Sequence, residues 1–323
     1  MKAQIIEQIE KVMQLHLSDA QMQLLHKTLN DIIPDTEQSL TDIKQTDYVQ
    51  IFLAAKRVEG CSDKTIRYYE STIRNVISAI NKSPECATTD DIRLYLDEYQ
   101  QKSGASKVTI DNIRRILSSF FSWLEDEDYI VKSPVRRIHK VKTCKTVKET
   151  YTDEALEIMR DSAECVRDLA IIDMLASTGM RVGELVKLNK ADIDFQNREC
   201  VVLGKGNKQR KVYFDARTKI HLKKYLDSRR DDNEALFVSL QKPYNRLQIS
   251  GVEIRLRELG RKLNLSKVHP HKFRRTLATM AIDKGMPIEQ VQQLLGHQSV
   301  DTTLQYAMVN QNNVKASHKK YIG

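Results

Sequence analysis

One stretch in the middle of the chain changes the periodicity of a sequence that is otherwise helical in pattern. Residues 191–215, ADIDFQNRECVVLGKGNKQRKVYFD, alternate apolar and polar side chains with a period of two around the segment GKGNK. Such a period indicates β-strands, and a glycine-rich turn between two runs indicates an antiparallel hairpin, with Lys205 and Gly206 at the turn. The sequence therefore predicts a mainly α protein that carries one small antiparallel β-sheet.

Helical patterns on both sides of the hairpin divide the 323 residues into four parts. Residues 1–45 show two short helical patterns, and residues 46–131 form a helical unit with apolar side chains at helical spacing. Residues 132–149 form a basic, proline-containing connector, and residues 150–323 are mostly helical around the hairpin. We therefore predict a helical N-terminal extension, a helical domain, a basic linker and a second domain. In the second domain, helices are expected at about 216–228, 248–263, 271–284, 287–295 and 300–308.

The net charge of +9 is unevenly distributed along the chain. Residues 1–45 hold 4 Lys and Arg against 7 Asp and Glu, whereas residues 141–323 hold 33 against 22. A basic domain indicates a polyanionic partner, with nucleic acid first among the candidates, although a basic protein without such a partner has the same composition.

Several cations lie where they could contact a phosphate backbone. Those in the helical unit lie off its buried stripe, and those in the linker follow a proline. A solvated face or a solvated linker explains them equally well. They are Lys107, Arg114, Arg115, Arg136, Arg137, Lys140, Lys142 and Lys145, joined in the second domain by Lys208 and Arg275.

Other features of the sequence narrow the class of protein. No apolar run approaches the ~18–20 residues that a membrane span needs, and the N-terminus has no signal-peptide pattern. The five cysteines are scattered without a CxxC spacing, so we expect reduced thiols and no zinc site. We expect a cytoplasmic protein without a membrane partner, a metal ion or a cofactor.

Two pairs of residues stand out as candidates for chemistry. Arg181 follows a strongly apolar helix and a tight turn, and Glu184 could orient it by a charge-assisted hydrogen bond. His271 and Arg274 are three residues apart after a proline, so they share one face of the first turn of a helix, where anions bind readily. Each pair alone also fits a surface ion pair or a passive contact with a DNA backbone.

Three further residues gain meaning only in combination with these pairs. Lys205 lies in the hairpin turn, His297 follows a glycine, and Tyr306 comes nine residues later. Arginines stabilise the charge of a phosphodiester under attack, a lysine can protonate the leaving oxygen, and a histidine can assist a phenol nucleophile. The set therefore indicates phosphoryl transfer to a tyrosine, and the lack of a carboxylate cluster favours a route without metal ions.

The sequence resembles the tyrosine recombinases of the phage-integrase and Xer type. The resemblance covers about 150–310 and rests on motifs in the order and spacing of that family. Residues 46–131 are similar, less specifically, to the family's SAM-like core-binding domain. The motifs are TGMRVGEL (178–185), GKGNKQR (204–210), HPHKFRRTLAT (269–279), LLGHQSVDTT (294–303) and Tyr306.

This resemblance implies a fold and an activity. The fold is mainly α, with a helical core-binding domain and a mostly α catalytic domain that holds a small three-stranded antiparallel β-sheet, the DNA breaking–rejoining fold. The activity is site-specific recombination through a 3′-phosphotyrosyl intermediate, which needs neither ATP nor metal. A protein with this activity would act on double-stranded DNA as a homotetramer on two sites. It would work in the cytoplasm at a prokaryotic nucleoid, and an accessory directionality factor is a further partner to consider.

The resemblance also implies a role for each matching residue. Tyr306 is the nucleophile, Arg181 and Arg274 hold the scissile phosphate, and Lys205 is the general acid. His271 contacts the phosphate and assists the tyrosine. His297 donates to the phosphate in the transition state, while Glu184 supports the site from behind.

Two departures and two alternatives accompany this prediction. Arg275 stands where the family often has histidine, and the acidic residues 1–45 do not resemble a basic arm-binding domain. The helix–Gly–helix pattern near 288–309 would also suit a DNA-binding regulator without catalysis, and the chemistry would also suit a type IB topoisomerase. The sequence does not distinguish integration, excision, inversion and dimer resolution.

Overall fold

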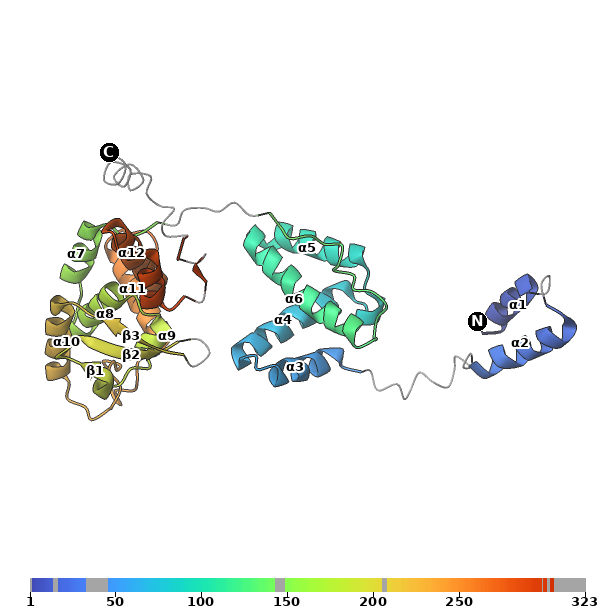
Figure 1. The fold of residues 1–323 in the computed structure, drawn as a ribbon, viewed down its shortest axis with the longest axis horizontal. Helices are drawn as coiled ribbons and strands as arrows, with labels where there is room; N and C mark the ends of the chain where they lie inside the picture. The colour runs from blue at the N-terminus through green and yellow to red at the C-terminus, as the bar shows by residue number, and fades with distance from the viewer. Residues whose placement is uncertain are drawn as a thin grey trace. The chain divides into compact units, whose positions relative to one another are not determined.

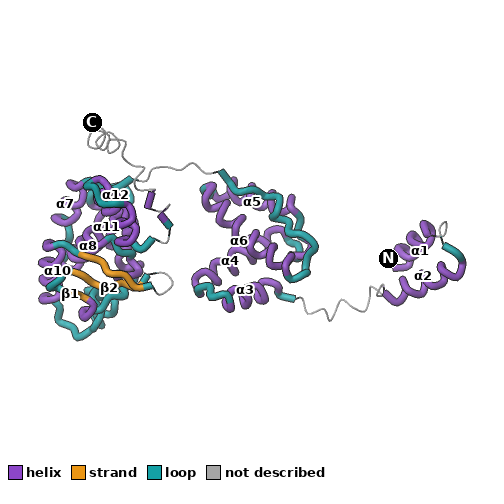
Figure 2. The backbone as a smooth tube through the Cα atoms, in the orientation of Figure 1, coloured by secondary structure: helices purple, strands orange, loops and turns teal. Residues whose placement is uncertain are grey.

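The computed structural model describes residues 2–13, 17–32, 46–142, 149–204, 208–297, 299–300 and 303–304. Contacts divide the chain into two compact units, Met1–Cys144 and Lys145–Gly323, here called the first and the second unit. Helices make up most of both units, and the strands found in the described ranges all lie in the second unit (Figure 1, Figure 2). The prediction of a mainly α chain with a small sheet is confirmed.

The first unit consists of helices. Two short ones at its start, α1 (Lys2–Met13) and α2 (Asp19–Ile32), pack against each other. The side chains of Asp47, Ser62, Thr88 and Ser106 then each accept a hydrogen bond from a backbone N–H in the first turn of the helix that follows. These four helices are α3 (Tyr48–Val58), α4 (Asp63–Ile80), α5 (Thr89–Ser103) and α6 (Lys107–Asp126), with a 3-10 turn, η1 (Pro84–Cys86), before α5.

Residues just after α6 complete the core of the first unit. Val135 is 1% exposed, and the hydroxyl of Thr89 donates to the carbonyl of Pro134 at 2.8 Å. The backbone N–H of Val141 donates to the buried carboxylate of Asp111 at 3.1 Å. The described part of the predicted linker, up to residue 142, is therefore a packed segment of the first unit, because its apolar side chains help to fill that unit's core.

The second unit is built around the apolar helix α8 (Val166–Thr178), against which α10 (Ala216–Ser228) and α12 (Pro270–Asp283) pack (Figure 1). Its run of buried residues, including Ile171, Met174 and Leu175, makes it the centre of the hydrophobic core. The other helices are α7 (Asp153–Asp161), α9 (Val182–Leu185), α11 (Ile249–Lys262) and α13 (Ile288–Leu295), with a 3-10 turn, η2 (Lys190–Asp192), before the sheet.

The sheet has three antiparallel strands in the order β1 (Ile193–Asp194), β2 (Glu199–Leu203) and β3 (Gln209–Tyr213). Cys200 pairs with Val212, and Val202 pairs with Arg210. Cys200, Val202 and Val212 are buried, while the alternate residues face solvent, which is the period of two that the sequence shows. The predicted three-stranded sheet is confirmed, and the turn residues 205–207 lie outside the described ranges.

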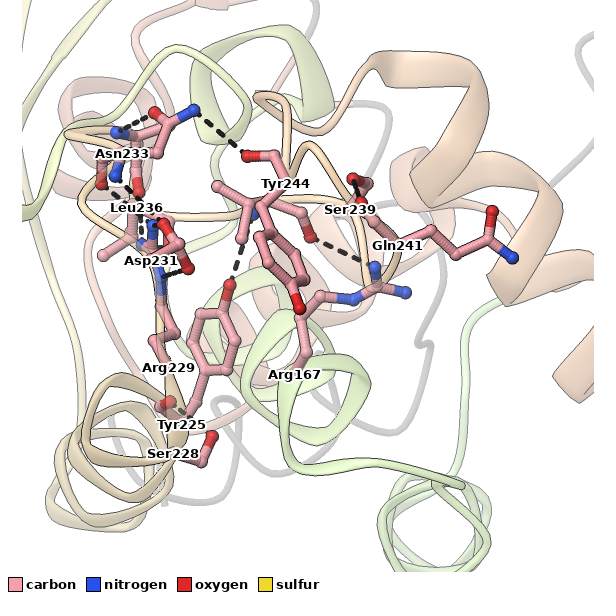
Figure 3. A network of polar contacts seen from close by, with 12 residues as sticks. Arg167, Tyr225, Ser228, Arg229, Asp231, Asn233, Leu236, Ser239, Gln241 and Tyr244 are labelled. Carbon is pink, nitrogen blue, oxygen red and sulfur yellow. Dashed lines mark hydrogen bonds and ion pairs between the residues drawn. The ribbon is translucent and has the colours of Figure 1, made fainter.

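The connection between α10 and α11 is held by polar contacts rather than by long strands (Figure 3). Arg229 donates to the carbonyl of Asn233 at 2.9 Å, and the side-chain amide of Asn233 donates to the carbonyl of Tyr244 at 3.1 Å. Arg167 on α8 donates to the carbonyl of Val238 at 3.1 Å. These contacts satisfy one buried and two partly buried backbone carbonyls and fix the chain that leads into α11.

Candidate active site

The turn between α8 and α9 places Arg181. Gly179 ends α8 in the left-handed conformation, with φ of 61°. A Cβ atom at this position would lie 2.7 Å from Cδ2 of Leu277, so the turn packs directly against α12. Arg181 is the N-cap residue of α9, and its side chain is 34% exposed. The turn thus presents a guanidinium group beside the first half of α12.

A buried carboxylate, Glu184, holds Arg181 in place. It accepts hydrogen bonds from Nη1 of Arg181 at 2.9 Å and from the backbone N–H of the same residue at 2.8 Å. It also accepts two hydrogen bonds from Arg210, each at 2.7 Å. Burial raises the pKa of the Glu184 carboxyl, but the hydrogen bonds outweigh it, that from Arg210 first, and leave the pKa below its usual value. The carboxylate therefore stays charged and holds the Arg181 guanidinium by a charge-assisted hydrogen bond.

Arg274 lies deeper, and its guanidinium joins two helix ends. The residue is 3% exposed. Nη1 donates to the carbonyl of Gly179 at 2.9 Å, and Nη2 donates to the carbonyl of Leu295 at the end of α13. These contacts satisfy carbonyl groups that a helix end leaves unpaired, and they fix the guanidinium between α8, α12 and α13.

Two histidines lie near these arginines. His271, exposed in the first turn of α12, has its pKa lowered by partial desolvation first and then by the charges of Arg274 and Arg181. His297 follows Gly296, the left-handed end of α13, and its Nδ1 is 2.8 Å from the hydroxyl of the buried Thr303. Burial, followed by the charges of Arg274 and Arg181, lowers the pKa of His297 to about 4. Both lowered pKa values favour the uncharged imidazole at neutral pH.

Contacts and charges together show which of the predicted site residues come together. Arg274 bonds the carbonyls of Gly179, two residues before Arg181, and Leu295, two residues before His297, and it shares α12 with His271. Four candidates from three separate motifs therefore come together in the second unit, and the charges of both arginines lower the pKa of both histidines. The two remaining candidates, Lys205 and Tyr306, lie outside the described residues.

The sequence reasoning missed Arg210. Its side chain is 12% exposed, it binds Glu184 with two nitrogens, and its Nε donates to the carbonyl of Leu294 at 3.2 Å. A Cβ atom on Gly296 would lie 2.8 Å from Cδ of Arg210, so the arginine packs on the turn that carries His297. A signal was available, because Arg210 lies two residues before the fully buried Val212 and so shares the inner face of β3.

The cations predicted to contact DNA fall into two groups. Arg114 is largely enclosed: its side chain is 15% exposed and its Nε lies 2.9 Å from Asp111. Arg275 is half-buried, near His271. Lys145 lies outside the described residues. The exposed members are Lys107, Arg115, Arg136, Arg137, Lys140, Lys142 and Lys208, of which Arg136 reaches Glu125 at 3.4 Å.

The described residues contain no group of three or more His, Cys, Asp or Glu side chains placed to hold a metal ion. None of the helices in these ranges has the length and apolar character to cross a membrane.

The fold and the site define a DNA strand-transfer enzyme, and comparison with known proteins gives its family. The chain matches the phage integrase family over residues 145–313 and the N-terminal SAM-like domain of phage integrases over residues 49–130. It belongs to the phage integrase family and is a site-specific recombinase of the tyrosine class, as its motifs predict. The alternatives of a non-catalytic regulator and a relaxing topoisomerase are not favoured.

Named relatives agree with this assignment. The chain is 30% identical to the tyrosine recombinase XerC of Oceanobacillus iheyensis over 294 residues, which cover 84% of this chain and 95% of the relative. It is 35% identical to XerC of Leptospira interrogans over 243 residues, covering 71% and 77%. The XerH site-specific recombinase, solved in a post-cleavage complex with a palindromic difH substrate, shares the fold with a TM-score of 0.68 at 19% identity, covering 98% of this chain and 95% of that one.

Proposed function

We propose that the chain cuts and rejoins duplex DNA at specific sites through a covalent bond between Tyr306 and a 3′ phosphate, with neither metal nor ATP. The observation that carries the proposal is the convergence of Arg181, Arg274, His271 and His297. Two guanidinium groups and two uncharged imidazoles suit a phosphodiester whose non-bridging oxygens gain charge during attack.

Each residue takes a distinct part in this proposed step. The phenol oxygen of Tyr306 attacks phosphorus and gives up its proton to His271, whose lowered pKa leaves it able to accept one at neutral pH. The bond from phosphorus to the 5′ oxygen breaks, and Lys205 protonates that oxygen. Arg181 and Arg274 stabilise the phosphate, and the neutral His297 donates a hydrogen bond to it. Attack by a free 5′ hydroxyl on the phosphotyrosine reverses every bond change, so no external energy source is required.

We propose that both units contact the DNA. Residues 46–131 would act as the core-binding domain, extended by the packed segment 132–142, and residues 150–323 as the catalytic domain, with the remainder of the predicted basic linker 132–149 joining them. The exposed cations of the first unit, such as Arg115 and Lys140, support this because DNA binding releases counterions wherever cations meet phosphates. A cytoplasmic location at the nucleoid is part of the same proposal.

Strand exchange between two DNA sites needs four active sites, so we propose a homotetramer on two sites. Residues 310–323, with Lys315, Lys319 and Lys320, would contact a neighbouring protomer. Deleting them should weaken assembly on paired sites more than binding to one site, measured by native gel electrophoresis. Equal tetramer formation by the truncated chain would contradict this. An accessory directionality factor is the remaining proposed partner.

The deciding experiment traps the covalent intermediate. A pool of nicked duplexes with randomised arms is incubated with the protein, because loss of the fragment beyond the nick prevents rejoining. We expect a denaturant-resistant protein–DNA adduct whose DNA reveals the recognised site. The adduct should disappear in Tyr306→Phe and persist in Tyr213→Phe, a control at a 54% exposed tyrosine on β3. An adduct that persists in Tyr306→Phe would refute the choice of nucleophile.

A further inference from the structure

Helix α11 carries cations that are neutralised within the protein. Arg255 contacts three carboxylates, those of Glu164 at 2.8 Å, Asp168 at 2.9 Å and Glu258 at 3.0 Å. Lys262 lies 3.5 Å from Glu164. This side of α11 is therefore a closed network of charges with no need of an external anion.

The same helix carries two arginines that are not paired with a carboxylate among the described residues. Arg257 and Arg261 are exposed, and neither forms an ion pair with a carboxylate in the described ranges. They lie four residues apart, so they point from the same face with Cβ atoms roughly 5–6 Å apart. Glu253 lies one turn before Arg257 on this face, but it forms no ion pair with it. The two neighbouring arginines therefore repel each other, and an external anion would relieve that repulsion.

These arginines line a hollow in the second unit, which we call the basic hollow. Arg257, Arg261, Lys267 and His269 contribute to its wall together with a glycine, an asparagine and two apolar residues, and no acidic side chain lines it. Lys267 is also exposed and without an ion pair among the described residues. The hollow thus gathers a histidine and three cations that form no ion pair among the described residues.

The backbone around the basic hollow is tightly fixed. A Cβ atom on Gly260 would lie 2.8 Å from Cγ2 of Val268, so the loop after α11 packs directly on that helix. The N–H of Leu265 donates to the carbonyl of Gly260 at 2.9 Å. Asn264 and Lys267 turn the loop with left-handed φ values of 52° and 47°. The cations are therefore carried on a defined scaffold.

The basic hollow adjoins the candidate active site. His269 lines the hollow and is the N-cap residue of α12, two positions before His271. Its backbone N–H lies 3.2 Å from the hydroxyl oxygen of Tyr151, which holds the start of α12. Of the acids nearby, Glu253 is close enough to act on both histidines, but it forms no ion pair with a described cation. A ligand that spans hollow and site must therefore carry several negative charges along its length.

We propose that the basic hollow binds the sugar–phosphate backbone of the duplex on which the site acts, close to the reacting phosphate. Arg257 and Arg261, one helical turn apart, would contact phosphates of one strand, and Lys267 would contact the same strand from the loop. This inference rests on the proposed function, since it takes duplex DNA as the substrate.

The test measures how binding depends on salt. The full chain is titrated into a fluorescent duplex of about 30 base pairs of mixed sequence at several salt concentrations. Log K decreases with log salt concentration, and the magnitude of this slope becomes smaller by about 0.9 for each phosphate contact that is lost. Arg257→Gln with Arg261→Gln should reduce the slope by about 2. Lys224→Gln with Arg230→Gln, which removes the same charge from exposed positions on and just after α10, should leave the slope unchanged.

The salt dependence of the two double variants decides whether the basic hollow contacts DNA. An unchanged slope in the Arg257 and Arg261 variant, or an equal fall in the control, would overturn the basic hollow as a DNA contact. Thermal unfolding by circular dichroism checks that both variants fold. The adduct assay tests the proposed function separately. A chain that forms no adduct but shows the specific change of slope would keep the DNA contact and refute the mechanism.

Discussion

Arg210 and Glu184 form a bidentate salt bridge, in which Nη1 donates to Oε1 and Nη2 donates to Oε2, each at 2.7 Å. The arginine comes from β3 and the carboxylate from α9, and the same carboxylate binds Arg181. One buried ion pair therefore connects the predicted hairpin to the turn that carries an arginine of the candidate site. Because Arg210 also reaches the carbonyl of Leu294, it connects both to the segment before His297.

Removing Arg210 should damage stability and the site together. Arg210→Met leaves a 4% exposed carboxylate with fewer partners, and breaking a buried pair in this way typically costs about 3–5 kcal/mol. Urea unfolding should show that the free energy of unfolding falls by about this amount in Arg210→Met and by less in Arg210→Lys. In Arg210→Met with Glu184→Gln, the loss should be less than the sum of the single losses. Additive losses would show that the two side chains do not act as a pair.

Arg181 and Arg274 should respond differently to truncation because their burial differs. Arg181→Ala removes a partly exposed side chain and should lower adduct formation by about 100- to 1000-fold, with DNA binding mostly intact. Arg274→Ala should abolish cleavage as well, and it should also cost about 1–3 kcal/mol, because it leaves the buried carbonyls of Gly179 and Leu295 without this donor. Unfolding curves measured beside the adduct assay test the contrast. Equal stability of the two variants would contradict it.

His297 should make the stability depend on pH in a defined direction. Burial first, and then nearby arginines, lower its pKa from 6.5 to about 4. The unfolded chain therefore takes up this proton at a higher pH than the folded chain. Its contribution to the free energy of unfolding is complete above pH 6.5 and is lost as the pH falls toward 4.

Urea unfolding across that range measures this effect. The slope from one group is at most about 1.4 kcal/mol per pH unit, and partial exposure reduces it. His297→Asn should remove this share of the slope, while His139→Asn, at an exposed histidine of the first unit, should retain it. His269 and His271 have pKa values lowered in the same direction, so part of the slope should remain in either variant. Superimposable wild-type and His297→Asn profiles would rule the contribution out.

The parts of the structure that follow from local pattern were predictable, and those that depend on long-range pairing were not. The period of two at residues 199–213 predicted β2 and β3, and the proline that begins α12 indicated where that helix starts. The bond from Arg274 to Gly179 joins residues 95 positions apart, and no local pattern encodes it. Arg114 differs in part, because its partner Asp111 lies only three residues earlier on α6. The burial of Asp111, which also accepts from the N–H of Val141 30 positions further on, is what the local pattern does not encode.

Two glycines allow the contact between Arg210 and the His297 turn to be tested alone. Gly296 and Gly285 both adopt left-handed conformations, with φ values of 64° and 90°. An alanine in that conformation costs about 1–2 kcal/mol at either position. A Cβ atom at Gly285 would meet nothing within 4 Å, whereas one at Gly296 would lie 2.8 Å from Cδ and 3.2 Å from Nε of Arg210.

Gly285→Ala therefore reports backbone strain, and Gly296→Ala reports the same strain together with displacement of Arg210. We expect both variants to lose stability in urea unfolding, but only Gly296→Ala to form much less adduct, because displacing Arg210 disturbs Glu184 and, through it, Arg181. Combining Gly296→Ala with Arg210→Lys, whose narrower side chain relieves the close approach, should restore part of the lost stability. If Gly285→Ala reduced adduct formation as much as Gly296→Ala, backbone strain alone would explain the effect, and Arg210 would not be a positioning residue for the site.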